Sequence, residues 1–188
     1  MRRSVMAGLL AAMCVTAGCA EAASVRTGHP PLGRSRWSAA RVTYDYSPGR
    51  IIEVAIEGRW MRDDGSFDHD FLHLTLPQKA GTYEVGAEAL RAERVVRVGQ
   101  EEFLYRATGG WATYRFSALP GDQVDVEFNL KMEVVYPKEL AGSTWPVQGT
   151  ARAPESVLTA QGLVNKYSAM VKRLTAEAAA KSDAPAKP

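Results

Sequence analysis

Apolar and polar residues alternate along much of the middle of the chain. The longest run extends from Gln123 to Val134, where every second residue is apolar and the residues between them are polar or charged. A period of two is typical of a β-strand that buries one face and exposes the other to water. Seven or eight such strands, separated by turns rich in Gly, Pro and Asp, predict a mainly β fold over 37–152. We expect an antiparallel β-sandwich or a small barrel.

Two hairpins can be placed from the turn residues. The alternating runs 42–46 and 52–60 flank a Ser-Pro-Gly-Arg turn, which predicts the first hairpin. The runs 103–108 and 111–117 flank Gly109-Gly110, and two glycines between alternating runs predict a second hairpin there.

A change to helical periodicity follows the predicted strands and indicates an amphipathic helix over 153–180. Val157, Val164 and Val171 share one heptad position, and Tyr167 and Leu174 lie at the other. These five residues form a candidate face for a partner helix. Packing of the same face against the protein's own sheet is the competing interpretation, and it is the default for one helix beside a β-domain. The last segment, 181–188, is polar, contains Ala and Pro, and is predicted to be disordered.

The amino terminus has a separate pattern. Arg2 and Arg3 precede an apolar run of eleven residues from Val5 to Val15, and small residues follow. A basic start, an apolar stretch and a small-residue segment are the parts of a secretory signal. Eleven helical residues span only about 16 Å, roughly half of the hydrocarbon core of a bilayer, so a permanent membrane-spanning helix is disfavoured.

The segment Val15-Thr16-Ala17-Gly18-Cys19 resembles the lipobox of bacterial lipoproteins. The resemblance implies that residues 1–18 are the signal peptide and that Cys19 becomes the lipidated first residue, which anchors the protein to a membrane. Thr16 departs from the aliphatic residue that is usual at its position. In a bacterium with two membranes, Ala20 after the cysteine implies sorting to the outer membrane, with the domain on the periplasmic face.

An ordinary signal peptidase offers a competing interpretation. The small-x-small sequence Ala20-Glu21-Ala22 would release a soluble periplasmic or secreted protein that begins near Ala23. In the lipoprotein interpretation, residues 19–36 are the lipidated amino terminus and a flexible tether, because they are small and polar and contain Pro30, Pro31 and Gly33.

Composition and charge exclude several classes of protein. The 188 residues are 46% hydrophobic and 23% charged, which fits one soluble domain. Removal of residues 1–18 takes away two arginines and leaves 21 basic and 21 acidic residues, so the mature chain has no net charge to attract nucleic acid. Two cysteines are too few for a disulfide scaffold or a cysteine-rich zinc module. We expect no cofactor.

An acidic segment is the main candidate for chemistry. Asp63, Asp64, Asp68 and Asp70 surround a predicted turn together with His69. Carboxylate oxygens can hold a metal such as calcium, and a histidine beside carboxylates can serve a hydrolase. The spacing does not match a calcium-binding loop, and Asp and Gly are ordinary turn residues, so a solvated turn is the competing interpretation.

Aromatic residues provide a second candidate. The four tryptophans Trp37, Trp60, Trp111 and Trp145 can form a groove on which a sugar or another flat ligand stacks, or they can pack in the core.

We therefore predict a lipid-anchored, non-enzymatic binding or structural accessory that works with an envelope protein. The alternatives are a small-ligand or glycan binder that uses an aromatic groove and a hydrolase built on acidic turns and His69.

Overall fold

The computed structural model describes residues 23–27, 36–39, 41–47, 51–86, 89–117 and 123–180, apart from the side chains of residues 37, 47 and 157. The predicted signal peptide 1–18, the lipidation residue Cys19 and the predicted tail 181–188 lie outside these residues. The elements are β1 (Ala23–Thr27), β2 (Arg36–Ser38), β3 (Arg41–Ser47), β4 (Ile51–Met61), β5 (Phe67–Pro77), β6 (Gly81–Glu84), β7 (Arg91–Val98), β8 (Glu101–Phe116), β9 (Gln123–Tyr136), the 3-10 turn η1 (Lys138–Leu140), β10 (Thr144–Pro154) and α1 (Val157–Ala180).

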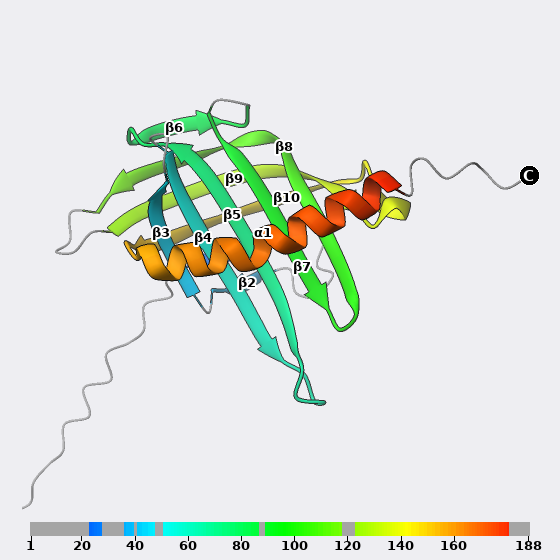
Figure 1. Ribbon diagram of the computed structural model, residues 1–188. Helices are drawn as coiled ribbons and strands as arrows, with labels where there is room; N and C mark the ends of the chain where they lie inside the picture. Colours follow the sequence, from blue (N-terminus) through cyan, green and yellow to red (C-terminus); the bar gives the residue numbers. More distant parts are fainter. Residues whose placement is uncertain are drawn as a thin grey trace, which may run out of the picture.

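The strands form one antiparallel sheet that curls into a half-barrel (Figure 1). Its order is β2-β1-β10-β9-β8-β7-β5-β4-β3, and β6 pairs with residues 111–114 of β8. The mainly β, antiparallel fold with a carboxy-terminal helix is confirmed. A single curled sheet, rather than two separate stacked sheets, encloses the core.

The curl brings the two halves of the sheet together beside β3. Glu155, which follows β10, forms a bridge with Tyr44, and the Ser156 amide donates a 3.0 Å hydrogen bond to the Tyr44 carbonyl. The Thr43 hydroxyl donates to the Pro154 carbonyl at 3.3 Å. These bonds satisfy backbone groups at an edge of the sheet that would otherwise remain open.

The inner face of the curled sheet supplies most of the core. In β9 the apolar residues are buried and the residues between them are partly or fully exposed, as the alternation predicts. The core also takes side chains from β3, β4, β5 and β7, so the two halves of the curled sheet cover each other. Its largest members include Tyr44, Ile52, Leu72, Leu74, Leu76, Tyr105, Tyr114 and Phe128.

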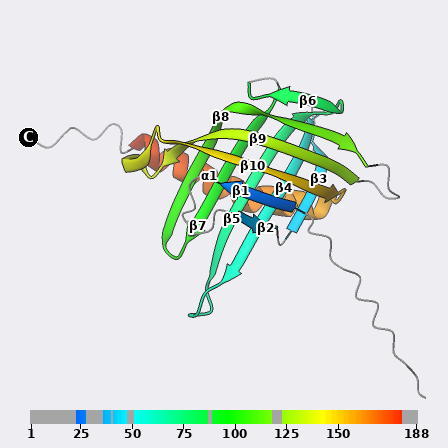
Figure 2. The same cartoon turned by 180° about the vertical axis from the view of Figure 1, so that it is seen from behind.

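Helix α1 lies across the outer face of β3, β4, β5 and β7, and from behind it is seen beyond the sheet (Figures 1 and 2). It closes a second, smaller core, here called the helix core, which is made of Ala55, Phe71, Val95, Leu104, Leu163, Tyr167 and Leu174. In the described part of the chain, no helix combines the length and the apolar character needed to cross a bilayer. The helix begins at Val157 rather than at the predicted residue 153, because the chain up to Pro154 belongs to β10.

The tether prediction is wrong for Ala23–Thr27. This segment is β1, which pairs with β10 on one side and β2 on the other. Ala23 and Val25 face the inner core and are 2% and 0% exposed. The segment is too short and too rich in small residues to show a clear apolar period, so its strand depends on two neighbours that are distant in sequence.

The second predicted hairpin is also wrong, because β8 passes straight through Gly109-Gly110. Gly110 has a φ of 101°, and a Cβ on it would overlap the backbone oxygen of Asn129 in β9. The glycine therefore permits a close approach of two strands at an irregularity in their pairing, rather than a reversal of the chain.

The two glycines provide a matched test. Gly110→Ala combines a strained φ with backbone overlap and should lower the free energy of unfolding by about 2 kcal/mol or more. In Gly109→Ala the new Cβ would meet nothing closer than the Lys131 Cβ at 3.9 Å. Its cost should stay within about 1 kcal/mol. Urea unfolding measures both values, and equal losses would contradict this account of Gly110.

Candidate functional site

The Glu57 carboxylate lies between the sheet and α1, and its side chain is 0% exposed. The Tyr167 hydroxyl donates to it at 2.6 Å from the helix, and Arg41 Nε donates at 2.6 Å from β3. Lys166 Nζ stands 3.4 Å away, and His69 Nδ1 is 3.6 Å away. These five residues are here called the Glu57 cluster.

Aromatic packing fixes the cluster in place. The Tyr167 ring stacks on the Phe71 ring with centroids 3.8 Å apart and an angle of 6° between the planes. The Tyr167 hydroxyl is also 3.4 Å from His69 Nδ1. Tyr167 therefore contributes both apolar area and a hydrogen bond, which is the usual role of a buried tyrosine.

The charges of the cluster follow from its contacts. Burial alone would raise the pKa of the Glu57 carboxyl, but the hydrogen bonds from Tyr167 and Arg41 outweigh it and hold the pKa below its usual value. Burial, helped by the Lys166 charge, lowers the pKa of His69, so this imidazole is neutral at pH 7. Burial and the bond to Glu57 raise the pKa of Tyr167.

This arrangement suits attachment better than catalysis. A carboxylate, an imidazole and a phenol lie within hydrogen-bond reach, but the Glu57 side chain is closed off from solvent and has donors from two elements. The hollow beside His69 is only about 40 Å³, about the space of one water molecule. The cluster ties α1 to β3 and β4.

A second buried pair lies inside the half-barrel. Arg94 Nε donates to the Asp70 carboxylate at 2.8 Å, and both side chains are at most 1% exposed. Arg94 Nη1 donates to the Thr27 hydroxyl at 3.0 Å, and its guanidinium lies over the Tyr105 ring. The pair therefore joins β5 and β7 to β1 across the inner core.

The four aspartates that were weak metal candidates do not come together in one site. Asp64 accepts hydrogen bonds from Ser66 within the turn, and Asp68 accepts from Arg62 and from the Gly99 amide. Asp70 points inward to Arg94, away from the exposed Asp63. Among the described residues, no three His, Cys, Asp or Glu side chains are placed to hold a metal ion.

The residues named for the alternative hydrolase function are also not brought together. Neighbouring residues of a strand point to opposite faces, so His69 lies under α1 while Asp70 is inside the half-barrel. The acidic turn does not reach His69, whose carboxylate neighbour is Glu57 from another strand.

The predicted partner-helix face is occupied by the protein's own sheet. Tyr167 and Leu174 are buried in the helix core, and Val164 and Val171 pack against it partly buried. The Val157 side chain lies outside the described part. The default interpretation of this face is the one that the structure shows.

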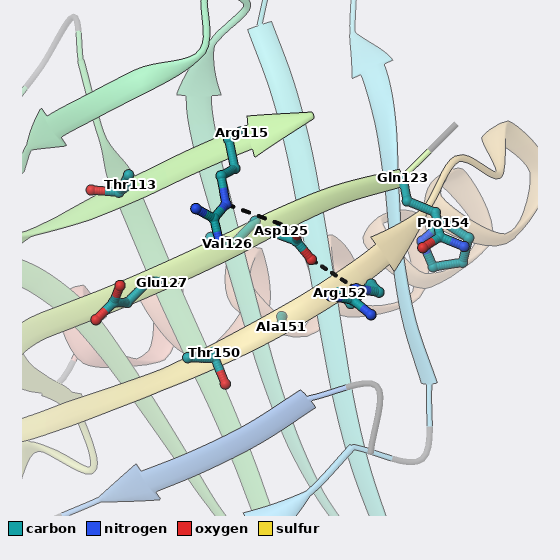
Figure 3. Close-up of a pocket in the computed structure, with 10 residues that line it drawn as sticks. All are labelled: Thr113, Arg115, Gln123, Asp125, Val126, Glu127, Thr150, Ala151, Arg152 and Pro154. Carbon is teal, nitrogen blue, oxygen red and sulfur yellow. Dashed lines mark hydrogen bonds and ion pairs between the residues drawn. The ribbon is translucent and has the colours of Figure 1, made fainter. Parts of the chain in front are cut away.

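A polar groove of about 570 Å³ lies on the outer face of β8, β9 and β10 (Figure 3). At its centre, Asp125 accepts a 2.8 Å hydrogen bond from Arg152 and lies 3.9 Å from Arg115 on the other side. Thr113, Glu127 and Thr150 form the next row along the same strands. Positive, negative and positive side chains therefore follow one another across β8, β9 and β10, and this arrangement suits a polar partner.

The three tryptophans whose side chains the structure describes do not form one groove. Trp60 and Trp145 pack against the inner core, partly buried, and the Trp37 side chain is outside the described residues. Trp111 and Trp145 do border one hollow of about 340 Å³, together with Asn129 and Lys131. This hollow lies beside Gly110, which as a glycine has no side chain to occupy it.

Comparisons with family models, with curated proteins and with solved structures find no match for this chain.

Sequence reasoning missed the buried charges, although one signal was present. Asp70 shares the inward phase of Leu72 and Leu74, and Arg94 shares the phase of Val96. A charged residue in the apolar phase of each of two predicted strands indicates a buried pair. Glu57 gave no such signal, because only the position of α1 makes its face of β4 an interior one.

The Tyr167 hydroxyl provides a pH-dependent test. Tyr167→Phe removes one donor from a buried carboxylate and should lower the free energy of unfolding by about 1–3 kcal/mol at pH 7. Because the lowered pKa stabilises the fold above the usual pKa of Glu, this cost should shrink as the pH falls through the folded pKa of Glu57.

Tyr114→Phe is the control, since the Tyr114 hydroxyl donates to the Pro77 carbonyl, which does not titrate. Its cost should be constant between pH 7 and pH 3. Urea unfolding across this range measures both variants, and a Tyr167→Phe cost that does not change with pH would contradict the assignment.

Proposed function

We propose that this protein is a lipid-anchored, non-enzymatic binding or structural accessory of the bacterial cell envelope, attached through Cys19. The observation that carries the proposal is the position of β1, which begins at Ala23, four residues after Cys19. Cleavage before Cys19 would remove the basic and apolar leader and leave every described strand intact. Cleavage at the lipobox-like segment is thus compatible with the described strands.

The position of Ala23 also favours Cys19 over the competing cleavage site. Cleavage after Ala22 would create a charged amino group on Ala23, which is 2% exposed. The Ala23 carbonyl accepts a hydrogen bond from the Ala39 amide, so the residue is part of the sheet at its very start. A charge at a buried position is costly unless it is paired. Cleavage before Cys19 places the new terminus outside the sheet.

The arrangement of charges supports binding over catalysis. Glu57 and the Asp70–Arg94 pair stabilise the fold and are closed off from solvent. The polar groove around Asp125 is open and lies on strands that the core holds rigidly. We propose that an envelope partner docks on such an outer surface, on the periplasmic face of the outer membrane, as Ala20 after Cys19 implies.

A glycan-binding role is a second candidate, and the hollow beside Gly110 favours it. Trp111 offers aromatic surface there, and Asn129 and Lys131 offer hydrogen-bond donors. Aromatic rings with a few polar groups are the usual components of a sugar site.

The glycan role predicts a tryptophan-dependent affinity. An N-acetylglucosamine trimer should change the tryptophan fluorescence of the protein in a saturable way, and Trp111→Ala should weaken binding at least tenfold. Trp60→Phe is the control, because Trp60 packs against the inner core and does not border the hollow. No saturable change with the native protein would rule out this glycan.

The anchor predicts different effects for the two cysteines. Cys19→Ser should abolish acylation and release the protein from the membrane fraction. Cys14→Ser should leave both unchanged, because Cys14 lies in the leader that would be removed. Metabolic labelling with a fatty acid and cell fractionation measure the two outcomes. A Cys19→Ser variant that is still acylated and still in the membrane fraction would refute the proposal.

A further inference from the structure

Four strand ends and the start of α1 lie at one end of the half-barrel. Ala23 is paired with Ala151, and β1 is antiparallel to β10, so the chain before Ala23 points toward the end of β10. Gln123 is paired with Pro154, and Phe116 is paired with Val124, so β9 begins and β8 ends at the same place (Figure 2). The helix starts three residues after Pro154. This region, defined by Ala23, Phe116, Gln123, Pro154 and Leu158, is here called the anchor end.

Chain length limits how far the anchor end can stand from an anchor on Cys19. Ala23 is the fourth residue after Cys19, and four extended residue steps span at most about 14 Å. Three strand spacings separate β1 from β8, which is also about 14 Å. Every part of the anchor end is therefore within a few residue lengths of a lipid attached to Cys19.

We propose that the anchor end rests on the lipid headgroups of the membrane and that the short connection to Cys19 holds it there. This inference depends on the proposed lipid anchor. A sheet that begins four residues after the lipid has no long tether, so one end of the domain must face the bilayer.

The exposed side chains of the anchor end fit a lipid surface. Among the described residues, four large apolar side chains are exposed, and two of them, Phe116 at 50% and Leu158 at 86%, belong to this end. Apolar side chains of this size favour the boundary between headgroups and acyl chains. Arg115 stands close by with 80% of its side chain exposed, and this long side chain can reach lipid phosphates. Arg152 is 49% exposed and donates a hydrogen bond to Asp125.

Met61 is a natural reference point away from this end. It is 73% exposed and ends β4, next to the turn that leads into β5. Met61 lies seven residues beyond Val54, which is paired with Tyr44 beside the end of β10, and seven strand residues span about 23 Å. A domain that rests on its anchor end therefore holds Met61 away from the bilayer.

Site-specific fluorescence tests this orientation. Cys19 would be the only cysteine of the mature chain, and its acylated sulfur cannot react with thiol reagents. Phe116→Cys, Leu158→Cys and Met61→Cys can therefore each carry one fluorophore. The lipidated proteins are placed in vesicles of phosphatidylethanolamine and phosphatidylglycerol that contain a lipid with a nitroxide on its headgroup.

The nitroxide lipid should quench the labels at positions 116 and 158 at least threefold more than the label at 61, and iodide in the water should show the opposite order. A fifteen-residue Gly/Ser insertion between Cys19 and Ala23 is the control and should remove the difference. Equal quenching at all three positions would overturn the inference, as would a difference that the insertion leaves unchanged. Shielding from iodide at 116 and 158 in the labelled proteins that also carry Cys19→Ser, without lipid, vesicles or detergent, would indicate contact between copies and would also overturn it.

The intact mass of the protein separates the two possible failures. If Cys19 carries no acyl chain, the proposed anchor fails before any fluorescence is measured. If Cys19 is acylated and the three labels are quenched equally, the anchor stands and only the orientation fails.

Discussion

The buried carboxylate of Glu57 is the interaction on which the arrangement of sheet and helix depends. One half of the curled sheet must have both of its faces covered. Its inner face packs against the other half of the sheet, and the outer face of β4 carries the buried residues Ala55 and Glu57. Helix α1 covers that outer face and brings Tyr167 to the carboxylate. Without this hydrogen bond the helix would cover a buried charge with one donor fewer, at a cost comparable to a large part of a domain's stability.

Buried charge also connects the amino terminus to the rest of the fold. The Asp70–Arg94 pair extends to Thr27, so β1 is held by a hydrogen bond across the inner core as well as by its neighbours β2 and β10. A buried pair by itself is weak evidence for stability, because desolvation offsets its attraction. Its effect here is to specify one position for a short strand with few apolar side chains of its own.

The sequence predicted an element correctly where the apolar pattern of that element alone identifies its buried face. The alternation in β9 and the heptad positions of Tyr167 and Leu174 predicted a half-buried strand and an amphipathic helix, and both are present. It failed where a distant element decides. Gly110 accommodates the neighbouring strand rather than a turn, β1 needs two partners, and the face of Glu57 is buried only because α1 lies on it. Of the candidate site residues, His69 and Tyr167 do meet, but Glu57, which joins them, carried no local signal.

The central proposal is that this domain is attached to a membrane through Cys19, which lies four residues before the first strand. The mass of the amino-terminal peptide of the native protein tests it most directly. We predict a peptide that begins at Cys19 and carries a lipid of several acyl chains. A peptide that begins at Ala23 and carries no lipid would contradict the account and would leave a soluble exported domain.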